Sequence, residues 1–356
     1  MSANAIEATR IPATPPQAPP TYLPPQYQQA QPPFDADDAD IILRTSDEVD
    51  FHVHKVVLSL ASRFFKSMFQ LPQQRLSLEA GVIELDVVPT VEESGVLDQL
   101  LRFCYPCADP LIATLDELHA VIEAMEKYQM HDVVARAQSQ LKAFLESDPV
   151  AVFAICCRFG WEDMAKRAAR SALAVPLSNF QTGWTVKELR YVTGEQHQAL
   201  LCYHSQCSAA ATAPLFDFRW LNSDSGWVWF TCQSCLPHPS PLVVTTRLGY
   251  AREARYVRRW FMDLVERVRA VLNDCPGVRL DPLALLTPVL KQTCGCPNCR
   301  ESAFEHIFKF LNETLMPRIN QELGKVCAIY ISSLLILILV LGSPEIAALI
   351  TTDASA

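Results

Sequence analysis

The spacing of apolar residues changes its period several times between residues 36 and 146. Residues 41–43 are all aliphatic and predict a short buried strand, whereas residues 49–53 alternate between apolar and polar and predict a second strand, which gives a hairpin. The spacing then becomes helical, with one apolar helix face made of Val57, Leu58, Ala61, Phe64, Phe65, Met68 and Phe69. Residues 82–85 predict a third strand. From these patterns we expect a core that includes Phe51, Leu58, Phe64 and Phe65.

Helical spacing continues after the third predicted strand. It predicts helices over residues 96–105, 114–127 and 131–146, and Pro106 ends the first of them because proline cannot continue a helix. Residues 148–173 predict two further short helices that are broken at Gly160. Cys156 and Cys157 lie in the first of these, where most cysteines are small core residues.

An amphipathic helix is predicted over residues 252–272. Its apolar stripe consists of Val257, Trp260, Phe261, Leu264, Val268 and Leu272. Outside the stripe lie four arginines, at Arg252, Arg255, Arg259 and Arg269. This basic face suits either a nucleic acid or acidic partner, or, as we favour, a solvated surface that pairs with Glu253 and Glu266.

The strongest continuous apolar run lies near the C-terminus, at residues 326–342, and contains no charged residue. As a helix it would be roughly 25 Å long, slightly short of a ~30 Å hydrocarbon core. Three interpretations stay open: a C-terminal membrane anchor, apolar sequence appended by a misread exon boundary, and a buried core helix. We therefore treat 323–343 as a separate apolar segment, followed by a tail at 344–356.

Composition and charge narrow the class of protein. The chain has 356 residues, of which half are apolar, and a net charge of −9 that disfavours general nucleic-acid binding. Residues 1–35 are rich in proline and glutamine and predict a disordered tail, because they bury too little surface to fold. The first residues lack the apolar stretch of a secretory signal, so we expect an intracellular protein, in the cytoplasm or nucleus.

The order of strands and helices, together with a long motif, resembles the BTB/POZ domain. The matching residues are Asp40, Phe51, His54, Lys55, Leu58, Ser62, Phe64, Phe65, Met68, Phe69 and Tyr105. Two residues depart from the family pattern: Arg63 stands where proline is frequent, and Pro106 follows the tyrosine where a small residue is usual. The resemblance covers about residues 36–146.

This resemblance implies an α+β BTB/POZ fold, a short sheet with a helical cluster, followed by a mainly α-helical C-terminal region. Residues 147–175 resemble the helical extension that often follows BTB domains, and residues 176–322 form a further region containing tryptophan and cysteine. This layout is similar to BTB proteins of mushroom-type fungi. By resemblance, such domains form homodimers and recruit protein partners, including ubiquitin-ligase scaffolds and transcription complexes.

His52 and His54 raise the alternative of a metal site. Two residues that are two apart on a strand share a face, but no further ligand is obviously placed to complete the set. We therefore expect His54 to have a structural role at the corner between strand and helix.

Two Cys-x-x-Cys pairs form the strongest candidate for a metal site. Cys232, Cys235, Cys296 and Cys299 supply the four thiolates of a structural zinc site, although about sixty residues separate the pairs. Other available ligands are Cys202, Cys207, Cys294 and His238. The competing interpretation is a set of free thiols. A redox Cys-x-x-Cys is less favoured, because neither pair has a thioredoxin-like setting.

The sequence contains no Walker A loop, nucleophile elbow or dinucleotide-binding motif, so we expect no catalytic residues and no certain cofactor. The leading hypothesis is a non-enzymatic adaptor that self-associates and binds protein partners. A membrane-associated adaptor anchored through residues 326–342 and a transcriptional regulator that uses the arginine-rich helix are the alternatives. We expect the tryptophans at 220, 227 and 229 to build core.

Overall fold

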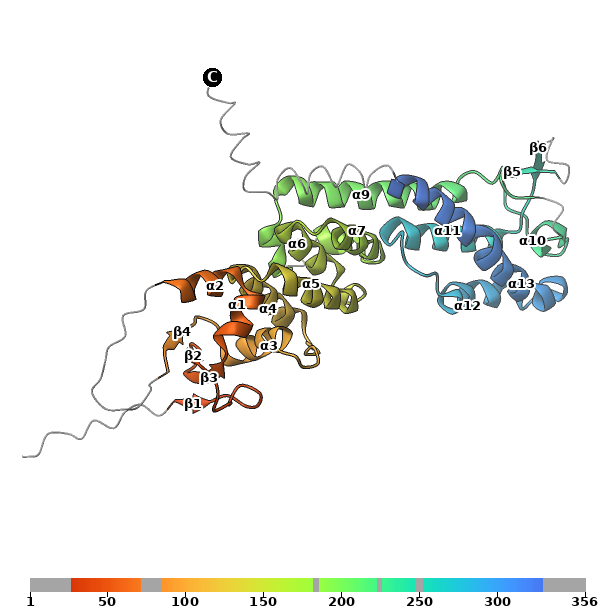
Figure 1. Cartoon of the computed structure of the whole chain (residues 1–356). Helices are drawn as coiled ribbons and strands as arrows, with labels where there is room; N and C mark the ends of the chain where they lie inside the picture. The colour runs from red at the N-terminus through yellow and green to blue at the C-terminus, as the bar shows by residue number, and fades with distance from the viewer. Residues whose placement is uncertain (1–26, 72–84, 182–185, 223–225, 247–251, 329–356) are drawn as a thin grey trace, which may run out of the picture. The chain divides into compact units, whose positions relative to one another are not determined.

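The computed structural model describes residues 27–71, 85–181, 186–222, 226–246 and 252–328 (Figure 1). The chain divides into two compact units. Unit 1 consists of Met1–Ile112 and Ala120–Ala137, and unit 2 consists of Ala113–His119 and Gln138–Ala356.

Unit 1 contains a four-stranded sheet in the order β1-β3-β2-β4. Its strands are β1 Gln28–Gln29, β2 Ile41–Arg44, β3 Val49–Val53 and β4 Val87–Pro89. The predicted hairpin is confirmed, since β2 and β3 pair antiparallel with Leu43 opposite Phe51. Alternate residues of both strands are buried, which is the period of two that the sequence shows.

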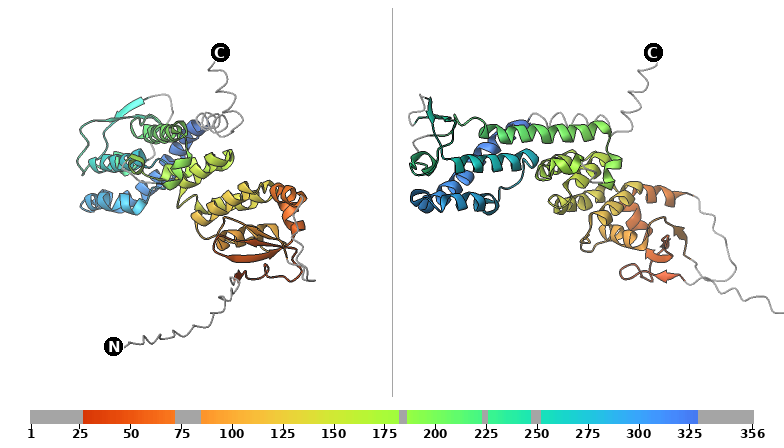
Figure 2. Two further views of the ribbon diagram at one scale, coloured as in Figure 1. Left: turned by 90° about the vertical axis from the view of Figure 1, so that its left-hand side faces the viewer. Right: turned by 180° about the vertical axis from the view of Figure 1, so that it is seen from behind.

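The helices of unit 1 lie to one side of this sheet (Figure 2). They are α1 Lys55–Ala61, α2 Arg63–Gln70, α3 Ser94–Cys104 and most of α4 Leu115–Lys127 and α5 His131–Gln140, whose remaining residues belong to unit 2. A 3-10 turn at Leu141–Phe144 follows α5, so the last predicted helix ends as α-helix six residues early. The α+β arrangement expected for this part of the chain is confirmed.

The strand predicted over 82–85 lies mostly outside the described residues. The described strand β4 begins at Val87, opposite Ile42 of β2.

One expectation for unit 1 needs correction. The tail predicted as disordered does not extend to residue 35. Phe34 is fully buried, with its ring 5.7 Å from Phe51, and its carbonyl accepts a hydrogen bond from His52 N–H. One large aromatic residue and backbone pairing outweigh the proline-rich composition; residues 1–26 lie outside the described part.

Unit 2 is mostly helical in its described part, as expected for the C-terminal region. Its helices are α6 Pro149–Phe159, α7 Glu162–Ser171, α8 Leu177–Gln181, α9 Gly194–Thr212, α10 Val228–Thr231, α11 Arg259–Asp274, α12 Pro282–Thr293 and α13 Pro297–Lys309. Short 3-10 turns lie at Ala172–Ala174, Lys187–Tyr191 and Ala213–Leu215. Strands β5 Leu242–Thr245 and β6 Arg252–Arg255 form a hairpin.

The predicted break between α6 and α7 is confirmed. Gly160 caps α6 with a φ of 70°, a left-handed conformation that glycine adopts without a steric penalty, and its N–H donates to the carbonyls at the helix end. Cys156 and Cys157 are both buried in the same helix. Burial raises the pKa of Cys157 to about 12 and raises that of Cys156 as well, as expected for core thiols.

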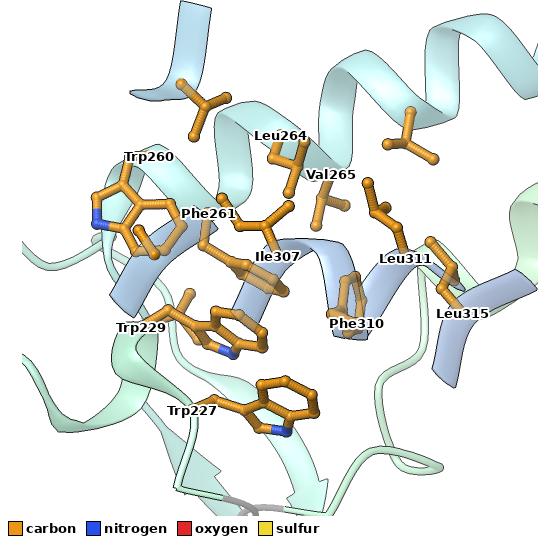
Figure 3. Close-up of a cluster of buried hydrophobic side chains, with 14 of the residues drawn as sticks. Trp227, Trp229, Trp260, Phe261, Leu264, Val265, Ile307, Phe310, Leu311 and Leu315 are labelled. Carbon is orange, nitrogen blue, oxygen red and sulfur yellow. The ribbon is translucent and has the colours of Figure 1, made fainter. Parts of the chain in front are cut away.

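An aromatic cluster forms the centre of the core between α10, α11 and α13 (Figure 3). Trp229 is fully buried and stacks on Phe261 at 4.4 Å and on Trp227 at 4.7 Å between ring centroids. Phe310 meets the edge of the same cluster from a π-helical turn at Phe310–Leu315. Trp227 and Trp229 therefore build core, as the sequence analysis expects, and Trp220 packs against the same cluster.

The helix predicted over 252–272 begins later than expected. All six residues of its apolar stripe are buried, but residues 252–255 form strand β6, because pairing with β5 satisfies their backbone. The four arginines therefore do not share one helix face. Arg255 pairs with Glu253 at 2.7 Å, and Arg269 donates to the carbonyl of Leu215 at 2.8 Å.

The predicted apolar segment at 326–342 is described only as far as residue 328, where a helix over 316–328 leaves the described part. Within the described residues, none of the helices has both the length and the apolar character needed to cross a bilayer. The three interpretations of this segment concern residues that mostly lie outside the described part.

Candidate functional site

The motif residues at the start of α1 form a polar corner. His54 caps the helix, and its backbone N–H donates to the Tyr105 hydroxyl at 2.9 Å. Its ring Nδ1 lies 3.1 Å from the same hydroxyl, and its Nε2 lies 3.3 Å from Asp38. Asp40 accepts from the backbone N–H of Lys55 at 2.7 Å, while the Lys55 ammonium pairs with Asp86. These contacts, all with side chains, support a structural role for His54.

A second part of the motif joins α2 to the end of α4. Ser62 accepts a hydrogen bond from Phe65 N–H at 3.0 Å and caps α2, and its hydroxyl donates to the carbonyl of Tyr128. Phe65 is buried and stacks on Tyr128 with 4.9 Å between ring centroids. Leu58 is fully buried, whereas Met68 and Phe69 are half-buried. This part of the motif therefore fixes the helices rather than forming a chemical site.

Phe64 corrects the predicted core. We expected its side chain to be buried, but 40% of it is exposed, because the chain breaks at Ser62 and α2 starts a new helix with a different face inward. Val56 and Leu60 on α1 are exposed by 64% and 81%. Val56, Leu60 and Phe64 together are called the apolar face below. Leu60 follows Val56 by four residues, a spacing that places both side chains on the same side of a helix. The sequence could therefore have indicated Leu60 as part of this face, although we did not predict it.

The four predicted zinc ligands meet in unit 2. Cys232 caps the C-terminal end of α10, and Cys235 follows in the next turn. Cys296 caps the N-terminal end of α13, and Cys299 lies in the first turn of that helix. The four sulfurs all lie within 4.8 Å of one another, and they form the only such group of three or more metal-binding side chains within the described residues.

The sulfur spacing fits a tetrahedral ion. Cys232 lies 3.6 Å from Cys296, and Cys235 lies 3.6 Å from Cys299. Zinc–sulfur bonds of about 2.3 Å in a tetrahedron place sulfurs about 3.8 Å apart, whereas a disulfide needs about 2 Å. All four cysteines are free, and Cys235 is the most exposed of them. The donor set and its spacing therefore fit zinc.

The electrostatic surroundings differ among the four thiols. The backbone N–H of Cys299 lies against Cys296 and lowers the pKa of Cys296 to about 6. Burial raises the pKa of Cys235 to about 11 and also raises that of Cys299. Without a cation the cluster therefore holds protons, because several thiolates in one buried group repel each other, and a divalent ion would displace those protons.

The alternative ligands are not part of this cluster. Cys202 and Cys294 are exposed, and the ring of His238 contacts the backbone of Ser240. Cys207 is buried elsewhere on α9. Arg258, which no sequence motif indicates, donates to the carbonyl of Cys235 at 3.0 Å and places a positive charge beside the cluster.

Comparison with known proteins adds one positive finding. The family model of the BTB/POZ domain matches residues 32–145. No curated protein matches the chain. The BTB/POZ domain is generally a protein–protein interaction module and is not typically enzymatic. The matched residues include the hairpin, the polar corner at His54 and the helices α1 to α5, so this part of the chain is a BTB/POZ domain.

Proposed function

We propose that the protein is a non-enzymatic adaptor that forms a homodimer through its BTB/POZ domain and recruits protein partners. The observation that carries this proposal is the exposed apolar face of Val56, Leu60 and Phe64. Val56 and Leu60 lie one turn apart on α1, and Phe64 is exposed at the start of the following helix α2. Large apolar side chains that are exposed to solvent favour burial against another protein. BTB domains often dimerise, and a second copy is the occupant that we assign to this face.

Self-association would give the adaptor its binding strength. A two-fold interface brings the same face of each copy together, which is the commonest solution for homo-oligomers. A dimer then offers two copies of unit 2 to a symmetric or repeated partner, and the second contact is strengthened by proximity.

Light scattering on the full-length chain at tens of micromolar tests the dimer. We expect twice the chain mass of 39.8 kDa for the wild type and a single chain mass for Leu60→Glu. Leu111→Glu is the matched control, because Leu111 is 96% exposed and lies outside the apolar face. A monomeric wild type, or a Leu60→Glu variant that remains dimeric, would refute this interface.

We also propose that the four cysteines hold a structural zinc ion. The support is the fit of four free thiols to a tetrahedral ion, and four thiolates leave no open position for a reacting water. Metal analysis of the purified full-length protein should find one equivalent of zinc. Cys232→Ser should retain less than a tenth of that, whereas Cys294→Ser, at an exposed cysteine outside the cluster, should retain all of it.

The thirteen free cysteines support a reducing, intracellular location.

A further inference from the structure

A second group of cysteines lies in unit 2, apart from the zinc candidates. Cys207 of α9 is fully buried, and Cys327, in the helix over 316–328, is 9% exposed. The Tyr203 hydroxyl, one turn before Cys207, lies 3.0 Å from the Cys327 sulfur. Cys207 and Tyr203 lie one turn apart on α9, and electrostatic coupling between the Cys207 and Cys327 thiols indicates that they are neighbours. Two cysteines that are 120 residues apart in sequence therefore both lie close to Tyr203.

Cys327 also lines a cavity. The cavity has a volume of about 630 Å³, and Arg170, Leu173, Gly277 and Asn320 are among its other lining residues. Arg170 lines the same cavity as Cys327, and its positive charge lowers the pKa of Cys327. A small solute in this cavity can therefore reach Cys327, whereas Cys207 is fully buried and is not among the lining residues.

The two thiols differ in character. The contact with Cys207 lowers the pKa of Cys327 to about 5; burial opposes this effect, while Tyr203 and Arg170 reinforce it. The same contact raises the pKa of Cys207. Cys327 is therefore both the more acidic thiol of the pair and the one that lines the cavity, whereas Cys207 is fully buried, which is the arrangement of an attacking and a resolving cysteine.

We propose that Cys327 and Cys207 form a peroxide-sensitive pair, in which Cys327 is oxidised first and Cys207 then closes a disulfide. The Cys327 thiolate attacks one oxygen of hydrogen peroxide, the O–O bond breaks, and the departing hydroxide takes a proton to become water. The Cys207 sulfur attacks the resulting sulfenic acid, the S–O bond breaks, and the hydroxide leaves as water with the Cys207 proton. In sum, two thiols and one peroxide give one disulfide and two waters.

This disulfide would join α9 to the helix over 316–328. The cysteine pair at Cys156 and Cys157 lacks these features, because burial raises the pKa of both thiols. The zinc candidates also differ, since a bound cation would occupy their sulfurs. The cavity, the positive charge of Arg170 and the neighbouring thiol of Cys207 together distinguish Cys327 from the other cysteines.

Peptide mapping of the full-length, zinc-loaded protein after brief treatment with hydrogen peroxide tests the pair. We expect a Cys207–Cys327 disulfide in the wild type and in the Cys202→Ser control, whose replaced cysteine is exposed on the same helix. In Cys207→Ser we expect a sulfenic acid at Cys327 that reacts with dimedone. Oxidation of Cys202 ahead of Cys327, or the absence of a Cys207–Cys327 link, would overturn the proposal.

The pH dependence of alkylation gives an independent measurement on unmodified protein. Between pH 8 and pH 6, a thiol of ordinary pKa loses about a hundredfold in rate of reaction with iodoacetamide, because the thiolate is the nucleophile. We expect less than a twofold change at Cys327. A hundredfold loss there would overturn the proposal even if the protein remained folded.

Discussion

The two units build their cores from different kinds of sequence signal. In unit 1 the core comes from short, regular elements, such as the β2–β3 hairpin, whose alternating residues are buried. In unit 2 the centre is an aromatic stack of Trp227, Trp229 and Phe261, with Phe310 more than eighty residues beyond the first tryptophan. Regular pairing stabilises the first core locally, whereas the second depends on bringing distant segments together.

Two of the four candidate zinc ligands lie in a segment of unit 2 that has little regular secondary structure. The segment from Trp227 to Arg258 contains only a four-residue helix and two four-residue strands in its described part. Such short elements form few backbone hydrogen bonds. Ordering the long loop that contains them also costs conformational entropy of the chain. A metal ion held by the four cysteines would tie α10 to the start of α13 and offset this deficit, so we expect unit 2 to depend on zinc and unit 1 not to.

The largest expected effect is therefore that of zinc removal. Structural zinc contributes on the order of 10 kcal/mol, so a strong chelator should loosen the region around the cluster and leave unit 1 unchanged. Hydrogen exchange on the full-length chain measures both at once. Amides of α10 and α13 should exchange faster by orders of magnitude, and those of β2 and β3 should not change.

Restoring zinc provides the control for this experiment, because protection should return on its addition if the metal is the cause. A chelated protein in which α10 and α13 stay protected would show that packing alone holds unit 2. An equal loss of protection in β2 and β3 would instead mean that unit 1 depends on zinc as much as unit 2 does.

The next largest effect concerns the core of unit 1. Phe65→Ala should cost about 3–5 kcal/mol, because its buried ring stacks on Tyr128 and leaves a cavity. Phe64→Ala, the neighbouring residue with 40% of its side chain exposed, should cost about 1 kcal/mol. The urea dependence of exchange at the β3 amides measures both losses. Equal losses would mean that the core of unit 1 is assigned wrongly.

Much of unit 1 could be predicted from the sequence, because its apolar residues recur with the regular spacing of a strand or a helix. The hairpin, α3 and the break at Gly160 in unit 2 all follow from alternation, helical spacing or a single glycine. Phe64 could not be placed, since one continuous helical stripe does not reveal that Ser62 starts a second helix. Phe34 was missed because its neighbours are mostly proline and glutamine.

The candidate metal centre was only partly predictable. The two Cys-x-x-Cys pairs gave the ligand types, but spacing alone did not exclude Cys207 or His238 as members of the set. Only the fold shows that α10 meets α13 and that Cys207 is buried on α9, outside the four-cysteine cluster. The strand at 252–255 was missed for a related reason, because pairing with β5 is a long-range contact that overrides local helical spacing.

A smaller effect should come from a partly exposed ion pair in unit 1 between Glu92 and Lys127. Burial opposes ionisation of Glu92, but hydrogen bonds from Lys127 at 2.6 Å and from Tyr128 outweigh this and lower its pKa below the usual 4.5. A carboxylate of lowered pKa stabilises the fold above pH 4.5 and loses that contribution as the pH falls through its folded-state value. Glu92→Gln should therefore cost about 1–2 kcal/mol at pH 7 and progressively less below pH 4.5.

Urea melts of the full-length chain at pH 7 and pH 3.5, again followed at β3 amides, measure this loss. Glu93→Gln is the control, because the neighbouring Glu93 is exposed. A loss at Glu92 that does not depend on pH would point to packing rather than charge.

The smallest effects test the two units with the same substitution. Gly160 of unit 2 has a φ of 70°, so Gly160→Ala should cost about 1 kcal/mol even though open space surrounds the position. Gly95 of unit 1 lies in α3 with nothing near an added methyl group, so Gly95→Ala should stabilise by about 0.5 kcal/mol, because alanine loses less backbone entropy. Hydrogen exchange at α6 and at α3 measures the two changes separately, and opposite signs are expected. A stabilising Gly160→Ala would mean that the end of α6 does not hold the left-handed conformation when alanine replaces the glycine.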